Sequence, residues 1–125
     1  MGNPLPKTTR IGTIGELFVQ LRLFEYGIQS APPIKDSGND LIAIKGEVVK
    51  FIQVKTSKHR IPSKEFPKIC HLVALVRLKY SEDGGLLLDD SKIYIIEKGE
   101  DRSQKKELTK ELADQIWNST DDRMI

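Results

Sequence analysis

The sequence predicts an α/β domain in which a central mixed β-sheet is flanked by helices. Three observations support this class. Apolar residues recur at helical spacing from Thr9 to Tyr26, short apolar runs bounded by Gly and Pro fill the middle of the chain, and a second helical pattern lies near the C-terminus. The expected order of elements is therefore one helix, five strands and one helix.

The first helix is expected over Thr9–Tyr26, with Gly27 as its stop. Its main apolar stripe consists of residues three and four positions apart, namely Ile11, Ile14, Leu17, Phe18, Leu21 and Phe24. A second apolar arc indicates that the helix is covered on more than one side; it contains Val19, Leu23 and Tyr26 with Gly12 and Gly15. Glu16 lies about 130° from the main stripe on a helical wheel, so it is either an ordinary exposed glutamate or the border of a buried groove.

Five strands are expected between the two helices. Pro32 and Pro33 restrict any strand in residues 28–35 to a short or edge position. A hairpin follows, with strands over Asp40–Lys45 and Val48–Thr56. Pro62 and Pro67 then leave room for a single helical turn at most.

The last two strands are expected over Leu72–Tyr80 and Lys92–Glu97. An amphipathic terminal helix is marked by Leu108, Leu112, Ile116 and Trp117. We find no repeat, low-complexity tract or linker long enough to divide the chain, so residues 1–125 are expected to form a single domain.

Apolar alternation fixes the expected register of the hairpin. With Gly46 and Glu47 as the central residues of a two-residue turn, Val49 faces Ile44 and Phe51 faces Ile42. A shift by one residue would mix buried and exposed positions. The favoured register also sets Gln53 opposite Asp40, with β-carbons roughly 5 Å apart, and puts Lys55 on the same face. Two hard oxygen ligands and an ammonium therefore gather beyond an apolar face.

These residues carry a resemblance to a known group of enzymes. A helix bearing a glutamate in "IGTIGELF", an Asp on one hairpin strand in "GNDLIAI" and a Q-x-K on its partner in "FIQVKTS" together resemble the PD-(D/E)xK nuclease superfamily. That superfamily includes restriction enzymes, archaeal Holliday junction resolvases and some homing endonucleases. The resemblance covers Ile11 to about Ser57 and implies a restriction-endonuclease-like fold. Gln53 stands where the family more often has a carboxylate, and Asn39 replaces the proline.

The resemblance implies a role for each matched residue. Asp40 would bind a divalent metal, Mg²⁺ or Mn²⁺, with the Gln53 side chain and the Val54 carbonyl as further ligands, and Glu16 would complete the shell. Lys55 would orient or deprotonate the attacking water, or stabilise charge on the phosphorane. Metal-assisted hydrolysis itself favours residues with side-chain oxygens, since Mg²⁺ prefers oxygen ligands and lowers the pKa of a bound water.

Ordinary structural roles remain open for the same residues. Asp40 could end a turn after Gly38 and Asn39. Gln53 and Lys55 could be edge groups that block strand addition. His59 and His71 are too isolated to indicate a site, and Cys70 is expected to be a small buried apolar residue.

Charge and composition indicate possible partners. Residues 1–80 carry most of the Lys and Arg, and residues 81–125 most of the Asp and Glu. The basic run after the Q-x-K element could contact DNA phosphates, or could be a solvated loop; it comprises Lys58, Arg60, Lys64 and Lys68. The single cysteine allows no internal disulfide, and no apolar run of about 20 residues could span a bilayer, so we expect a cytoplasmic protein without membrane contact.

The sequence thus predicts a Mg²⁺-dependent DNA endonuclease that hydrolyses phosphodiesters, of the Holliday junction resolvase type or the homing or restriction type. A domain this small offers little surface for a long duplex, so a homodimer or higher homo-oligomer is expected. Two alternatives remain: a catalytically inactive nucleic-acid-binding module on the same fold, and a protein-interaction module that uses the acidic terminal helix, Glu107 to Trp117.

Overall fold

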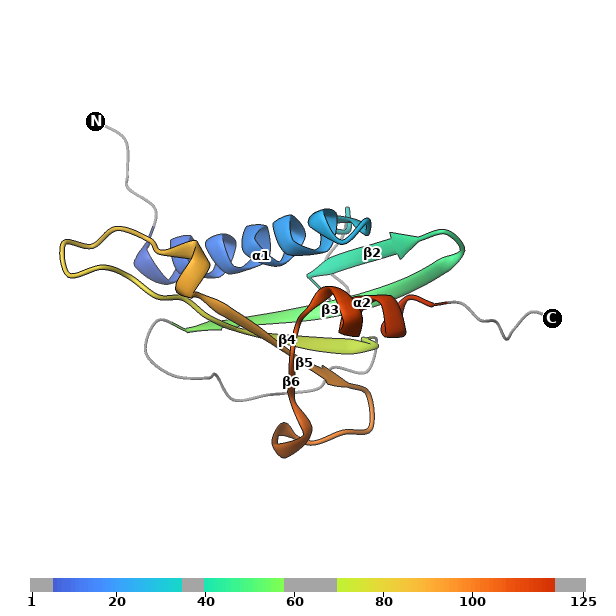
Figure 1. Ribbon diagram of the computed structural model, residues 1–125. Helices are drawn as coiled ribbons and strands as arrows, with labels where there is room; N and C mark the ends of the chain where they lie inside the picture. Colours follow the sequence, from blue (N-terminus) through green and yellow to red (C-terminus); the bar gives the residue numbers. More distant parts are fainter. Residues whose placement is uncertain (1–5, 35–39, 58–69, 119–125) are drawn as a thin grey trace.

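The computed structural model describes residues 6–34, 40–57 and 70–118. Two α-helices and six strands are joined in the order α1, β1 to β6, α2, with short 3₁₀ turns before β5 and before β6 (Figure 1). The bounds are α1 Lys7–Glu25, β1 Gln29–Ala31, β2 Leu41–Lys45, β3 Val48–Ser57, β4 Leu72–Arg77, β5 Lys92–Glu97, β6 Lys106–Glu107 and α2 Lys110–Ile116.

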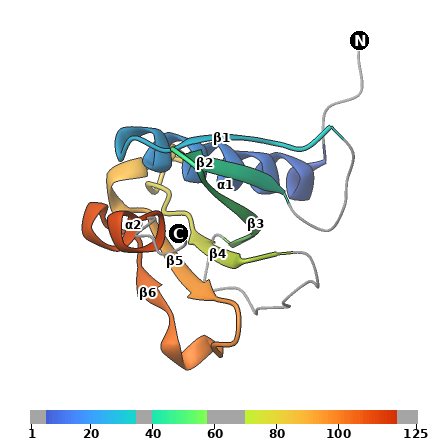
Figure 2. The same cartoon turned by 90° about the vertical axis from the view of Figure 1, so that its right-hand side faces the viewer.

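The six strands form one sheet in the order β1-β2-β3-β4-β5-β6. The β3–β4 pair is parallel and the other four pairs are antiparallel. In Figure 2, β1 and β2 lie beside α1, whereas β5 and β6 extend away from it. The predicted α/β class with a central mixed sheet is therefore confirmed.

The hairpin of β2 and β3 has the predicted register. Ile42 pairs with Phe51 and Ile44 with Val49, and the ladder closes at Lys45 and Val48 around the two-residue turn. Gly46 in that turn has φ +61°, a conformation that favours glycine. Alternating apolar side chains were sufficient to fix this register because a slip by one residue would reverse every side chain.

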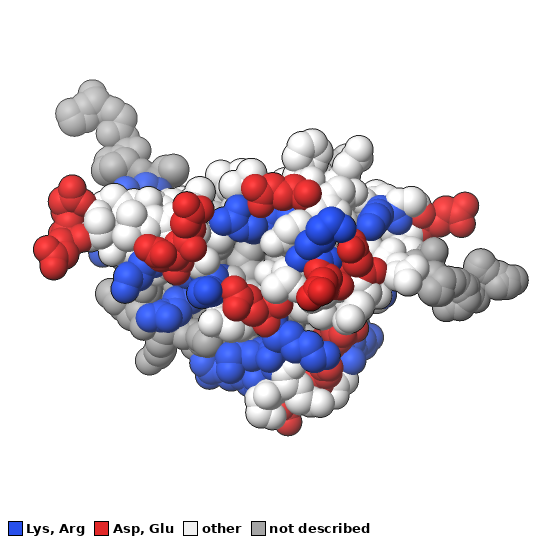
Figure 3. Space-filling model, in the orientation of Figure 1, with Lys and Arg blue, Asp and Glu red and all other residues white. Residues whose placement is uncertain are grey.

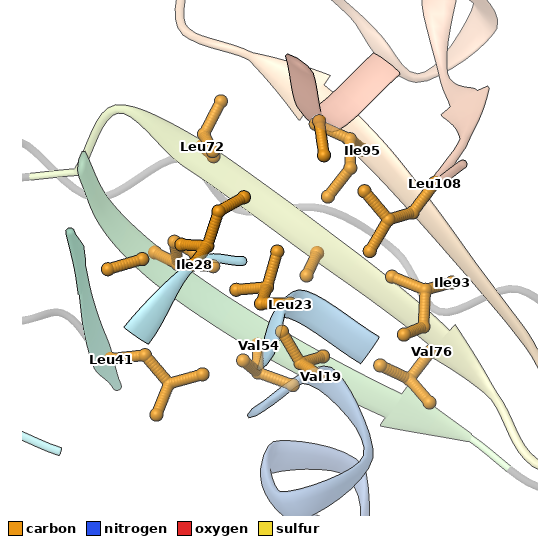
Figure 4. Packing of buried hydrophobic residues seen from close by; sticks show 14 of the residues in the cluster. Val19, Leu23, Ile28, Leu41, Val54, Leu72, Val76, Ile93, Ile95 and Leu108 are labelled. Carbon is orange, nitrogen blue, oxygen red and sulfur yellow. The ribbon is translucent and has the colours of Figure 1, made fainter. Parts of the chain in front are cut away.

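Apolar side chains are buried on both faces of the sheet. The larger cluster includes Ile52 and Val54 of β3 and packs against both described helices, so α1 and α2 cover the same face (Figure 4). Trp117 anchors the end of α2 by donating its indole N–H to the Ala43 carbonyl at 3.2 Å. The opposite face has a smaller cluster made of Cys70, Val73, Leu75 and Ile96.

The predicted main apolar stripe of α1 is wrong in part. Leu17, Leu21 and Phe24 are 57%, 42% and 69% exposed. The residues that face the sheet belong mostly to the second arc, and the buried set is Gly15, Phe18, Val19 and Leu23. Counting large apolar residues on the helical wheel selected the wrong side because it gives no weight to the small residue that permits close packing.

Several boundaries also differ from the sequence prediction. β2 begins at Leu41 instead of Asp40, and β4 ends at Arg77, three residues before the predicted end. β1 is a three-residue edge strand, as the two prolines indicated. β6 was not predicted because two residues, Lys106 and Glu107, are too few to show alternation. The predicted turn around Pro62 and Pro67 lies outside the described residues.

Gly15 brings α1 into unusually close contact with β3. A β-carbon built at this position would lie 1.9 Å from the Thr56 hydroxyl oxygen and 2.8 Å from two Thr56 carbon atoms. Because Thr56 is β-branched, rotating its side chain cannot clear all three atoms at once. The helix therefore requires glycine here in order to lie directly on the second half of β3.

We expect Gly15→Ala to destabilise the protein by about 1–3 kcal/mol, the usual cost of overpacking, despite the higher helix propensity of Ala. Gly12, one turn earlier, is the matched control because nothing lies within 4 Å of its β-carbon position. Gly12→Ala should stabilise by up to about 1 kcal/mol. Urea unfolding of both variants measures the difference, and equal stabilities would contradict the close contact.

Candidate functional site

β3 extends well beyond its antiparallel partner. The β2–β3 register ends at Leu41 and Ile52, while β3 continues to Ser57 and pairs there with β4. Among the described strands, none pairs with the other edge of β3 over residues 53–57. An extended strand presents N–H and C=O groups along such an edge, and these groups need partners.

Asp40 lies at the point where this open edge begins. Its backbone N–H donates to the Ile52 carbonyl at 2.8 Å, so Asp40 and Leu41 both oppose Ile52, as in a β-bulge. Its carboxylate oxygen Oδ2 accepts the backbone N–H of Val54 at 2.8 Å. The carboxylate thereby takes the place of a missing strand carbonyl.

The predicted pairing of Asp40 with Gln53 is not present. The ladder ends one residue earlier, and the bulge turns the Asp40 side chain toward the N–H of Val54. The sequence argument extended the strict alternation of β2 by one residue too many, because a bulge leaves no signal in the apolar pattern.

Glu16 approaches the same place from α1. Its half-buried side chain lines a cavity of about 390 Å³ together with Val54, Thr56 and Ser57 of β3. Burial raises the pKa of the Glu16 carboxyl, and the negative charge of Asp40 raises it further. Of the two alternatives left open for Glu16, the border of a groove therefore agrees with the structure, and the two carboxylates interact electrostatically.

Gln53 and Lys55 occupy the other face of β3. Ile52 and Val54 are buried in the cluster beneath the helices, so the alternating side chains of Gln53 and Lys55 point to the opposite face. In the parallel register Gln53 lies beside Val73 and Lys55 beside Leu75, which are buried on that opposite side. The structure thus brings Glu16, Asp40 and Val54 together, with Gln53 and Lys55 on neighbouring positions of the same strand.

The donor set agrees in kind with a hard divalent cation. The two interacting carboxylates of Asp40 and Glu16 lie beside the Val54 backbone, whereas the Gln53 amide belongs to the opposite face of β3. Carboxylate and amide oxygens are ligands that Mg²⁺ accepts. The Val54 N–H occupies only one of the several acceptor positions on the Asp40 carboxylate. Within the described ranges there is no group of three His, Cys, Asp or Glu side chains that could hold a metal.

Two residues near the site were not predicted as functional. The Cys70 thiol donates to the Leu72 carbonyl at 3.0 Å, and burial raises its pKa, while the Gln53 backbone lies close enough to lower it partly. His71 bridges to β3, since its Nδ1 accepts the Phe51 N–H at 2.9 Å and its backbone N–H donates to the Phe51 carbonyl. Only the parallel β3–β4 pairing places them here, and the sequence contains no signal for that pairing.

His71 has a structural role in this arrangement. Burial lowers the pKa of its imidazole, and the positive charges of Lys50 and Lys98 lower it further. The ring is therefore neutral near pH 7, as it must be to accept a hydrogen bond at Nδ1. The prediction that Cys70 is buried is confirmed, with 2% of its surface exposed.

The predicted DNA contacts cannot be placed. Lys58, Arg60, Lys64 and Lys68 lie outside the described residues, as does His59. Neither of the two described helices is long and apolar enough to cross a membrane. Cytoplasmic location stays a prediction.

Comparison with known proteins finds similarity at the level of structure. No family model matches the chain, and no curated protein matches it. A solved structure of a bacterial homing endonuclease, I-Ssp6803I, is similar with a TM-score of 0.45 and 17% sequence identity, over 74% of this chain and 67% of that one. At this level of similarity we draw no conclusion about function from it.

The proximity of Glu16 and Asp40 can be measured by titration. Because the pKa of Glu16 is raised, the folded protein holds this proton more tightly than the unfolded chain, and stability falls as pH rises from the ordinary Glu value through the raised one. We expect Asp40→Asn to lower the pKa of Glu16 but to leave it above its ordinary value, since burial is the larger cause.

Carbon-detected NMR of the Glu16 carboxyl group measures this change. Asp114→Asn is the control, because Asp114 of α2 pairs with Lys45 of β2 and Lys110 of α2 and is not among the causes of the Glu16 pKa shift. A Glu16 titration curve that is identical in wild type and Asp40→Asn would show that the two carboxylates are too far apart to act on one ion.

Proposed function

We propose that the protein is a Mg²⁺-dependent DNA endonuclease that hydrolyses phosphodiesters, of the Holliday junction resolvase type or the homing or restriction type. One observation carries the proposal. The Asp40 carboxylate is fixed by Val54 at the open edge of β3, within electrostatic reach of the half-buried Glu16. Two carboxylates held together in this way are stabilised by a bound cation, because like charges otherwise oppose joint ionisation.

Each residue has a distinct task in this proposal. The carboxylates of Asp40 and Glu16, the amide oxygen of Gln53 and the carbonyl of Val54 would hold the metal. When bound, Mg²⁺ would supply a water of lowered pKa and positive charge at the scissile phosphate. The ammonium of Lys55 would orient the attacking water and stabilise the developing negative charge.

The hydrogen bond from Val54 gives Asp40 its main advantage. A carboxylate that already accepts a backbone N–H cannot turn freely, so one of its oxygens is held in a defined direction before any ion binds. Such prepositioning reduces the ordering that binding would otherwise require. The same β3 segment bears Gln53 and Lys55, so the strand itself sets the spacing of the proposed ligands and the lysine.

A catalytically inactive DNA-binding module is the second candidate. It is favoured by one observation: Gln53 and Lys55 point to the face of β3 opposite to α1, which carries Glu16. A nuclease must yield a metal-dependent product, whereas a binding module needs only a salt-sensitive complex. A protein-interaction module would show neither.

Cleavage of supercoiled plasmid and of a four-way DNA junction tests the nuclease. We expect product with Mg²⁺ and none with EDTA, and a loss of about 10²–10³-fold in rate for Asp40→Asn or Lys55→Ala. Asp40→Asn keeps an oxygen that can accept the Val54 N–H, so the β3 edge should remain folded.

Each cleavage variant has a control that removes the same charge, and the lysine control lies on the same strand as Lys55. Lys50→Ala removes an ammonium from the same strand, and Asp89→Asn removes a fully exposed carboxylate next to Arg22. Both should retain wild-type rates. If all four variants cut DNA as the wild type does, or if EDTA has no effect, the nuclease proposal is wrong.

The homodimer is also a proposal, and α1 offers a surface for it. Leu17, Leu21 and Phe24 are exposed and follow one another at intervals of four and three residues, the spacing of a coiled-coil seam. Residues at these spacings are neighbours on a helix, so the three side chains form one apolar strip. We propose that a second copy of the chain covers this strip with its own α1.

Light scattering after size-exclusion chromatography measures the association. Leu21→Glu should shift the protein toward monomer because it buries an unpaired charge at the interface. Val49→Glu is the matched control, since Val49 on the hairpin and Leu21 on α1 are both 42% exposed. A monomeric wild type, or equal effects of the two variants, would rule out this interface.

A further inference from the structure

A second cavity of about 600 Å³ lies beside the candidate site and is strongly basic. Its lining contains four cationic side chains from two distant segments: Lys7 and Arg10 at the start of α1, and Arg77 and Lys79 at the end of β4 and just after it. All four residues are exposed. Among the described residues that line the cavity there is no Asp or Glu.

Among the described residues, Arg22, Lys45, Lys92, Lys106 and Lys110 each form an ion pair with an acidic side chain, in contrast to the four cations of the cavity. Within the part of the chain that the structure describes, none of the four forms an ion pair. The absence of ion pairs at the cavity differs from the dense band of Lys and Arg that Figure 3 shows over β5 and β6. There Lys92 pairs with Glu107 and Lys106 with Glu100, so part of the charge is already compensated.

One wall of the cavity is held rigidly by hydrogen bonds. The backbone N–H of Lys79 donates to the Ser91 hydroxyl at 2.9 Å, and the Leu87 N–H donates to the Lys79 carbonyl at 2.8 Å. Tyr80, which also lines the cavity, forms a β-bridge with Leu86. The backbone that carries Lys79 is thus fixed before any ligand arrives.

The basic cavity adjoins the groove beside Glu16. Lys7 and Ile11 line both, and in the β3–β4 register Ser57 of the groove lies beside Arg77 of the basic cavity. Val54, which holds Asp40, lies three strand residues before Ser57, a separation of about 10 Å at roughly 3.3 Å per residue. This corresponds to about three base pairs of axial rise in B-DNA.

We propose that this basic cavity, lined by Lys7, Arg10, Arg77 and Lys79, binds the sugar-phosphate backbone of DNA on one side of the phosphodiester at the candidate site. The inference rests on the proposed function, because it takes Asp40 and Glu16 as the reaction centre. Arg and Lys recognise phosphate oxygens by charge-assisted hydrogen bonds, and such interactions position a duplex without reading its sequence. The site is additional to the basic run that follows β3.

Binding of a short fluorescein-labelled DNA duplex, measured by fluorescence anisotropy in EDTA at several salt concentrations, tests the proposal without any cleavage. The test variant combines Lys7→Gln, Arg10→Gln, Arg77→Gln and Lys79→Gln. The control removes the same charge from the β5–β6 side and α2 by Lys92→Gln, Arg102→Gln, Lys106→Gln and Lys110→Gln. All eight side chains are exposed, so neither change affects the core.

The slope of log affinity against log salt should fall in magnitude by roughly 0.9 for each phosphate that the test variant no longer neutralises. In the control variant the slope should change little.

Equal reductions in both variants, a larger reduction in the control, or no binding by the wild type would overturn the proposal. So would equal displacement of DNA by polyglutamate at the same charge concentration, since the cavity would then favour an acidic protein. Circular dichroism and the melting temperature confirm that both variants fold, and the double variant Arg10→Gln with Lys79→Gln should give half the effect.

Failure of this inference can be distinguished from failure of the nuclease. A wild type that binds through the basic cavity but yields no product with Mg²⁺ would refute the nuclease and keep the binding site. A wild type that cuts DNA, with a salt slope unchanged in the test variant, would refute the binding site and keep the nuclease.

Discussion

The unequal length of β2 and β3 is the constraint on which the candidate site depends. β3 has ten residues and β2 has five, so the second half of β3 pairs with β4 and leaves its other edge open. An open edge in the interior of a fold needs partners for its backbone groups. Asp40 supplies one of them for Val54, which places a carboxylate where a strand carbonyl would otherwise lie.

The same extension of β3 determines where the first helix can lie. Gly15 rests against Thr56, so α1 contacts β3 in the half that β2 leaves uncovered. That close packing in turn brings Glu16 beside Val54 and Thr56. The helix is thereby turned so that Leu17, Leu21 and Phe24 face outward. The close approach of one glycine thus accounts for both the acidic groove and the exposed apolar strip.

Sequence reasoning was most successful where a regular period governs the structure. The pairs Ile42–Phe51 and Ile44–Val49 follow from the alternation of apolar residues along the hairpin strands. β5 was predicted with its observed bounds as a short apolar run, and it buries residues on both faces of the sheet. The register failed at Asp40 because a bulge interrupts that period without changing the residue types. The orientation of α1 failed because the decisive residue, Gly15, carries no hydrophobic signal. Cys70 and His71 reach the site only through a parallel pairing between strands distant in sequence, which no local pattern encodes.

The buried thiol of Cys70 makes the junction between β3 and β4 chemically observable. Its raised pKa and its hydrogen bond to the Leu72 carbonyl keep it protonated and shielded, so a thiol-specific reagent reacts only after the start of β4 separates from its surroundings. This cysteine is the only one in the chain, so every alkylation event reports the same opening. A single atom beside Gln53 therefore records local unfolding of the strand pair that carries the proposed catalytic lysine.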